Sequence, residues 1–243
     1  IYRELRKHLN THPVGFSGTE GEAELKLLKR IFTPNQAALV CRIDWHHHTT
    51  NEIFPAVKDL VDSIDHLETE LRVIAEAGGL FHRKRNQTDT WAIAPFMIGM
   101  WEMNVDRIDE EFKRVHRAWG KSPKTDAPKH NGSTRQMRVI PIGETITQEH
   151  RVAPYDEIAA LVDEAGASIG VMDCVCRKYK RLEGHVCHFS DTPAVCTSFR
   201  DWAEQDIENG TARRVSKDEI LELFEKARDA GLVLMPSATQ EPM

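Results

Sequence analysis

Four of the chain's five cysteines lie in one short segment, residues 173–196, which reads DCVCRKYKRLEGHVCHFSDTPAVC. They are Cys174, Cys176, Cys187 and Cys196, with the spacing C-x-C-x10-C-x8-C. In a reducing compartment, clustered cysteines are more often metal ligands or redox groups than disulfides. The segment therefore predicts a metal centre, and the chain has to fold so that these four side chains meet.

The spacing of the cysteines bears on the kind of metal centre. Four thiolates suit either a tetrahedral zinc ion or an iron–sulfur cluster. Zinc sites mostly take cysteines in pairs separated by about two to four residues, whereas a single residue separates Cys174 from Cys176. We expect a buried strand over 168–173, after which these two side chains point the same way in extended chain. The spacing favours a [4Fe–4S] cluster and leaves zinc as the alternative.

Basic residues follow the first cysteine pair directly: Arg177, Lys178, Lys180 and Arg181. Thiolates and bridging sulfides carry net negative charge, which nearby cations and N–H donors offset. We expect Arg177 and Lys178 to act on the cluster in this way, and the alternative is a solvated basic loop. His185 and His188 flank Cys187, and we expect them beside the cluster or at the surface because four cysteines suffice as ligands.

The first part of the chain has the pattern of several helices followed by a β-hairpin. Apolar residues at helical spacing predict a helix over 63–77, which Gly78-Gly79 ends. Two extended runs, 80–85 and 90–95, are separated by the turn-like NQTD. Helices followed by such a hairpin are typical of a winged helix, so we expect a winged-helix-like domain over residues 1–97.

The rest of the chain predicts a connection and a second domain. A helix over 101–119 and a stretch without apolar anchors form the expected connection, residues 98–136. Elements expected beyond it are a strand over 137–142, a helix over 155–165, a strand over 168–173, a helix over 197–209 and a helix opened by Ser216. The chain is thus expected to be α+β, with a small α/β iron–sulfur domain over 137–243.

Longer stretches of the sequence resemble a family of 4Fe–4S-binding, ferredoxin-like proteins of anaerobic bacteria and archaea. The stretches are HPVGFSGTEGEAELKLLKRIFTP, MWEMNVDRIDEEF, MRVIPIGETITQEHRVAPYDEI and CVCRKYKRLEGHVCHFSDTPAVC, which together reach across most of the chain. The family's pattern C-x-C-R … C-x-H … C is matched by Cys174, Cys176, Arg177, Cys187, His188 and Cys196. The resemblance implies one [4Fe–4S] cluster held by the four cysteines, behind a winged-helix-like region.

Composition limits the function classes. A net charge of −6 argues against a chain that mainly coats nucleic acid, and no apolar run is long enough for a membrane span. No apolar leader is visible, so we expect a cytoplasmic protein. No nucleophile–base set and no nucleotide-binding glycine motif stands out. We expect an electron-transfer protein or a subunit of a redox complex, partnered by an oxidoreductase, rather than a stand-alone enzyme.

Two other readings remain open. One is a winged-helix DNA-binding regulator that senses redox state or oxygen through the cluster. The basic run His82-Arg83-Lys84-Arg85 favours it, and the carboxylates Asp65, Glu68, Glu70 and Glu76 of the preceding helix weigh against it. The other is an interaction protein stapled by zinc. His46-His47-His48 is interpreted as a surface turn, and Cys41 as a packed thiol.

Overall fold

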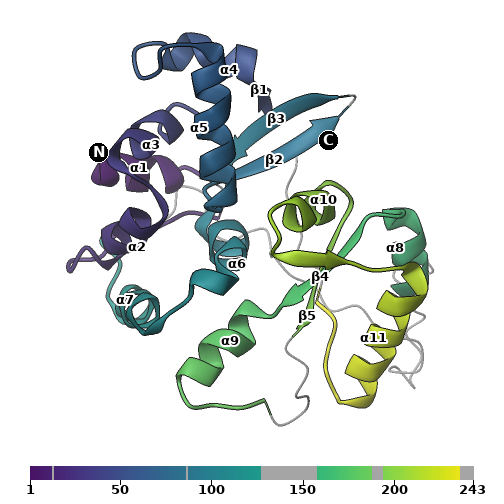
Figure 1. Cartoon of the computed structure of the whole chain (residues 1–243). Coiled ribbons are helices and arrows are strands. Elements are labelled where there is room, and N and C mark those ends of the chain that lie inside the picture. The colour runs from purple at the N-terminus through teal and green to yellow at the C-terminus, as the bar shows by residue number, and fades with distance from the viewer. Residues whose placement is uncertain (13, 86, 127–157, 188–193, 236–243) are drawn as a thin grey trace. The chain divides into compact units, whose positions relative to one another are not determined.

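The structure is a computed structural model that describes residues 1–12, 14–85, 87–126, 158–187 and 194–235 (Figure 1). Contacts divide the chain into two compact units, Ile1–Ser133 and Thr134–Met243. In the described residues, each unit combines helices with its own three-stranded sheet, and every strand pair is antiparallel. The expected α+β class is therefore confirmed.

The first unit contains most of the helices described. In chain order its elements are α1 (Tyr2–Leu9), α2 (Ala23–Ile31), α3 (Pro34–Val40), β1 (His48–Thr49), α4 (Thr50–Val57), α5 (Ile64–Glu76), β2 (Leu80–Arg85), β3 (Thr88–Ile93), the irregular turn η1 (Phe96–Met100), α6 (Trp101–Met103), the 3-10 turn η2 (Val105–Arg107) and α7 (Glu110–Lys121). The predicted helix over 63–77 and the hairpin that follows it are both present.

The sheet of the first unit has the strand order β1-β3-β2. Leu80 pairs with Ile93 at one end of the hairpin, and His48 of β1 pairs with Trp91 of β3. Trp91 is fully buried, and its indole N–H donates to the Thr50 hydroxyl at 3.1 Å. Because Thr50 begins α4, this hydrogen bond joins the helical layer to the sheet.

Local sequence signals explain where two of these helices begin. Thr33 caps α3 and Thr49 caps α4, each through a capping box. The threonine hydroxyl accepts the backbone N–H of the residue three positions later, and the side chain of that residue accepts the backbone N–H of the threonine. The residues three positions later are Gln36 and Glu52, respectively. Reciprocal caps of this kind satisfy N–H groups that a helix start leaves unpaired.

The single long helix expected over 101–119 is wrong. The chain leaves α6 at Asn104, whose side-chain amide donates to the carbonyls of Met100 and Ala77 at 2.8 and 3.1 Å. The next helix, α7, begins after Asp109, whose carboxylate accepts the N–H of Phe112 at 2.7 Å and caps it. A buried asparagine that bonds to backbone, followed by an N-cap, breaks a pattern that looks continuous in sequence.

The second unit is built around a sheet of order β5-β4-β6. Its described elements are α8 (Ile158–Ala165), β4 (Ile169–Asp173), α9 (Val175–Leu182), β5 (Ala194–Phe199), α10 (Arg200–Glu208), β6 (Ala212–Arg214) and α11 (Lys217–Asp229). The expected strand over 137–142 and the start of the helix over 155–165 lie outside the described residues.

The two faces of this sheet meet different helices. On one face, Ile169 and Val171 pack with Val162 of α8 and with Ile220 and Phe224 of α11 in a common apolar core. The other face meets α10. There, a Cβ added at Gly170 would lie 2.9 Å from the Ser198 hydroxyl and 3.6 Å from the Ala203 Cα, so a glycine is needed for the close approach.

The helix expected over 197–209 begins later than predicted. Residues 194–199 form β5, which pairs along β4 from Phe199 opposite Ile169 to Ala194 opposite Asp173. The helix α10 starts only at Arg200, which has a positive φ of 57° and turns the chain out of the sheet. Pairing with β4 therefore overrides the helical pattern of this segment.

In the described residues, no helix is both long and apolar enough to cross a membrane.

Candidate metal centre

Strand β4 positions Cys174, the first cysteine of the predicted metal centre. Its residues Ile169 to Met172 are buried, Asp173 is exposed, and Cys174 follows immediately as the N-cap of α9. The extended conformation expected at Cys174–Cys176 is wrong, because α9 begins at Val175. The carbonyl of Cys174 accepts the N–H of Lys178 at 2.9 Å, which closes the first helical turn.

Strand β5 brings the last cysteine to the same edge of the sheet. Cys196 pairs with Met172, two positions before Cys174, and the next pair joins Asp173 to Ala194. The register shifts between these pairs, so Val195 is the extra residue of a β-bulge. Bulges bend a strand and redirect its side chains. Here the bulge at Val195 lies next to Cys196, at the end of β4 that Cys174 follows.

The Cys174 side chain lies in hydrogen-bond contact with the side chains of Cys176 and Cys196. These two contacts, together with the backbone N–H groups of Arg177 and Cys176, lower the pKa of Cys174 to about 2 against the opposing effect of burial. A thiolate at a helix N-terminus is also favoured by the helix dipole. These contacts favour the thiolate form of Cys174, which is the form of cysteine that ligates metals.

The other predicted site residues have different placements. Cys187 is half-buried on the segment that follows α9 and the turn at Gly184. Arg177 and Lys178 lie in the first turn of α9, where the backbone N–H groups contact the sulfur and the carbonyl of Cys174. His188 lies outside the described residues. The contribution of these backbone N–H groups was not predicted, because it depends on α9 starting at Val175.

The donor set suits a thiophilic centre, although the thiols contact one another directly. In the part of the chain that the structure describes, no three His, Cys, Asp or Glu side chains surround a common point in the way that ligands surround a metal ion. Cys174, Cys176 and Cys196 nevertheless gather at one sheet edge, with Cys174 in contact with the other two. Cysteine sulfur is the soft type of ligand that zinc and iron–sulfur clusters take, so these three side chains are suitable donors for either centre.

A buried carboxyl group lies on the same face of the sheet as Cys196. Asp206 of α10 is 5% exposed, and burial raises its pKa to about 6, while contact with the Ser198 hydroxyl limits the rise. Ser198 is two residues from Cys196 on β5, and side chains two apart share a face. Nothing in the local sequence distinguishes Asp206 from the acidic residues around it. Only the packing of α10 identifies it.

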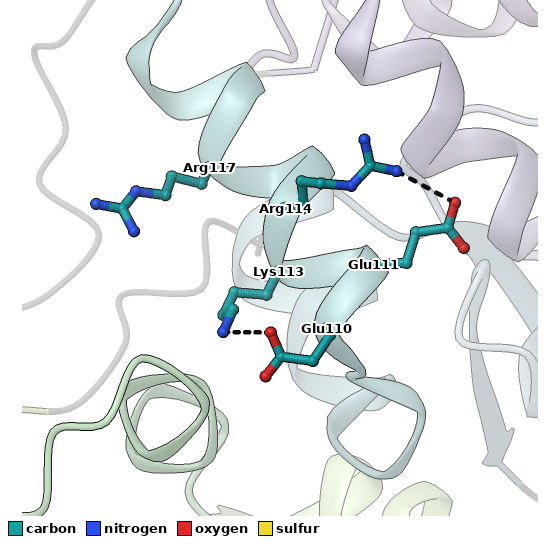
Figure 2. A pocket seen from close by; sticks show the side chains of 5 residues that line it. All are labelled: Glu110, Glu111, Lys113, Arg114 and Arg117. Atoms are coloured by element: carbon teal, nitrogen blue, oxygen red, sulfur yellow. Dashed lines mark ion pairs between the residues drawn. The ribbon is translucent and has the colours of Figure 1, made fainter.

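The described residues of the first unit also form a shallow hollow along α7, shown in Figure 2. It is lined by Glu110, Glu111, Lys113, Arg114 and Arg117. Glu110 pairs with Lys113 at 2.5 Å and Glu111 with Arg114 at 3.7 Å, both within the helix. All five side chains come from one helix and the lining holds no nucleophile. The hollow therefore does not provide a catalytic set.

The histidine run and the isolated cysteine are part of the first unit's structure. Asp44 accepts the N–H of His46 and contacts the His48 ring, both at 2.8 Å, and these bonds lower the pKa of Asp44 against the effect of its burial. Cys41 ends α3 and is half-buried. Burial, followed by the nearby carboxylate of Glu4, raises the pKa of Cys41 to about 11. Such a thiol is a poor ligand and a poor nucleophile.

The basic run of the hairpin is partly held in intramolecular contacts. His82 stacks on Trp91 with ring centroids 4.4 Å apart and contacts the Asp89 carboxylate at 2.6 Å. Arg72 of α5 pairs with both Glu68 and Asp89 at 2.8 Å. These contacts hold His82 at the start of the run against the sheet and neutralise Arg72 on the neighbouring helix.

Comparisons with protein-family models, with curated proteins and with solved structures found no match to this chain.

Proposed function

We propose that the chain is an iron–sulfur protein that holds one [4Fe–4S] cluster and passes single electrons to or from a redox partner. The proposed ligands are Cys174, Cys176, Cys187 and Cys196. The observation that carries the proposal is the contact of the Cys174 side chain with the side chains of Cys176 and Cys196. Cys174 lies at the end of β4, Cys176 in α9 and Cys196 in β5. The cluster would supply a one-electron couple, and the chain would supply its ligation and its surroundings.

The cysteine spacing favours a cluster over a zinc ion in this proposal. A single residue separates the close cysteine pair, which differs from the usual zinc knuckle. The N–H groups of Cys176 and Arg177 contact the Cys174 sulfur and suit either centre, and at a cluster such contacts would tune the reduction potential. Zinc remains the alternative, in which the same cysteines would staple an interaction domain.

In the same proposal, the first unit is a winged-helix-like module that docks other proteins. Its order α3, β1, α4, α5, β2, β3, with the sheet order β1-β3-β2, supports the winged-helix assignment. The ion pairs of Arg72 with Glu68 and Asp89 reduce the positive charge that α5 offers to phosphates. They favour protein docking over the alternative of a DNA-binding regulator.

The test is anaerobic purification of the whole chain with iron, zinc and acid-labile sulfide measured per chain. A brown protein with iron and sulfide in the equal amounts of a cubane supports the proposal. Electron paramagnetic resonance after reduction then reports whether the cluster accepts one electron. A colourless protein that contains zinc and no sulfide contradicts the proposal and supports the zinc-stapled reading.

A further inference from the structure

Among the described elements of the second unit, helix α9 carries the largest number of cations. Its eight residues, Val175–Leu182, include four cations and no carboxylate, although the whole chain has a net charge of −6. The cations are Arg177, Lys178, Lys180 and Arg181. By contrast, α11 of the same unit carries charges of both signs along its length. The described cations of α9 are therefore not offset by a carboxylate within the helix, whereas Arg213 and Arg214 of β6 pair with Glu219 and Glu204.

This helix is also accessible within its own unit. Val175 is the one buried residue of α9, and the other residues of the helix are half-buried or exposed. Figure 1 shows α9 leading away from the end of β4. The Lys180 side chain is 62% exposed and pairs with Glu183 at 2.8 Å, and Arg181 is exposed. Beyond the helix, Val186 exposes 59% of its surface, which adds an apolar contact point.

The basic helix and the cysteines form one continuous structure. Cys174 is the N-cap of α9, and Cys176 lies in its first turn. Electron transfer between proteins requires the redox centres to approach closely, because the rate falls steeply with their separation. A partner that exchanges electrons with a centre at Cys174 therefore has to dock near α9. A basic surface steers and orients a partner whose contact face is negative.

We propose that α9 is the docking surface for the acidic face of the redox partner. This inference rests on the proposed function, since it names the class of partner that the cluster serves. Positive charge concentrated beside the redox centre of an otherwise acidic chain selects for the sign of the partner's contact surface. It also predicts association that weakens as salt screens the charges.

The test compares charge reversals on two helices of the second unit in the whole, cluster-loaded chain. One variant carries Lys180→Glu and Arg181→Glu on α9, and the matched control carries Lys226→Glu and Arg228→Glu on α11. Both change the net charge equally. The control cations are likewise exposed and paired with nearby carboxylates, Glu222 and Asp229. A difference between the variants therefore reports the place of the charge and not its total.

Ferricyanide is the anionic electron-transfer probe. One electron passes from the reduced cluster to ferricyanide, which yields the oxidised cluster and ferrocyanide. We expect the α9 variant to react about tenfold more slowly at low salt, the α11 variant to change by less than about twofold, and the difference to vanish at high salt. Equal slowing in both variants, or no slowing in either, overturns the proposal.

Binding of a labelled polyglutamate peptide, followed by fluorescence anisotropy, tests the docking surface without needing the cluster. We expect the α9 variant alone to lose most of the binding. If a DNA duplex of equal charge binds wild type more tightly than polyglutamate and also depends on α9, the surface is a nucleic-acid site and the proposal is wrong. Absence of iron and sulfide, in contrast, removes the proposed function, and the peptide measurement still decides whether α9 binds acidic chains.

Discussion

Cys196 lies beside Cys174 because the antiparallel ladder pairs Cys196 with Met172. The two cysteines are far apart in sequence, and the strand pairing brings them to one sheet edge. Cys176 joins them from the first turn of α9. The proposed cluster depends on this one junction of two strands and a helix.

Substitution of single cysteines tests the ligand set. We expect Cys174→Ser, Cys176→Ser, Cys187→Ser and Cys196→Ser each to lose most of the iron and sulfide, because each removes one proposed thiolate ligand. Cys41→Ser is the matched control, since Cys41 lies in the first unit. Anaerobic iron and sulfide analysis measures the outcome. A Cys187→Ser protein with a full cluster would contradict the assignment of Cys187 as the fourth ligand.

The buried carboxyl of Asp206 predicts a stability that depends on pH. Burial raises its folded-state pKa from 3.8 to about 6, so the folded state binds the proton more tightly than the unfolded state does. The stabilising effect of protonation is complete below pH 3.8 and is lost as the pH rises through about 6. At pH 8 the ionised group costs about 3 kcal/mol by this linkage.

Asp206→Asn removes that cost and is expected to raise the free energy of unfolding at pH 8 by about 1–3 kcal/mol, with little change near pH 4. Denaturant titrations at the two pH values measure the difference. Glu208→Gln, an exposed position at the end of the same helix, is the control and is expected to change stability by less than about 0.5 kcal/mol. An equal effect of Asp206→Asn at both pH values would contradict the interpretation.

Two glycines test the packing of the first unit. A Cβ at Gly79 would lie 2.3 Å from the Phe32 ring and 2.8 Å from Ile74, whereas nothing lies within 4 Å of a Cβ at Gly120 in α7. We expect Gly79→Ala to lower the free energy of unfolding by about 1–3 kcal/mol through overpacking. Gly120→Ala is expected to raise it by up to about 1 kcal/mol, because alanine favours the helix.

Denaturant unfolding followed by circular dichroism measures both changes. Opposite signs for the two substitutions support the packing of β2 against α5 and Phe32. Tolerance of alanine at Gly79 would show that this close approach is absent in solution.

DNA titration tests the regulator reading. Asp65 and Glu76 are exposed on α5, while Arg72 and His82 contact Asp89. Carboxylates on this face oppose phosphate, so we expect weak binding without sequence preference. Fluorescence anisotropy at two salt concentrations, with the cluster present and removed, measures it. Specific binding with a steep salt dependence that changes on cluster loss would favour the regulator instead.

Local sequence patterns predicted several elements of the first unit well. Apolar residues at helical spacing and the Gly78-Gly79 stop predicted α5, and the two extended runs predicted the hairpin β2–β3. These signals act through neighbouring residues, so they can be read from the sequence alone. The break at Asn104 was missed, because its amide bonds to Ala77, a residue far from it in sequence.

The sequence by itself determined which side chains the second unit has for a soft-metal site: four cysteines in one segment, with a run of cations after the first two. Tertiary structure alone decided how three of these cysteines approach one another. Residues 194–199 form a strand because β4 supplies the hydrogen-bond partners, and local propensity does not contain that information. The packing of α10 against β4 and β5 buries Asp206. Pairing between distant segments is settled only when the whole chain folds.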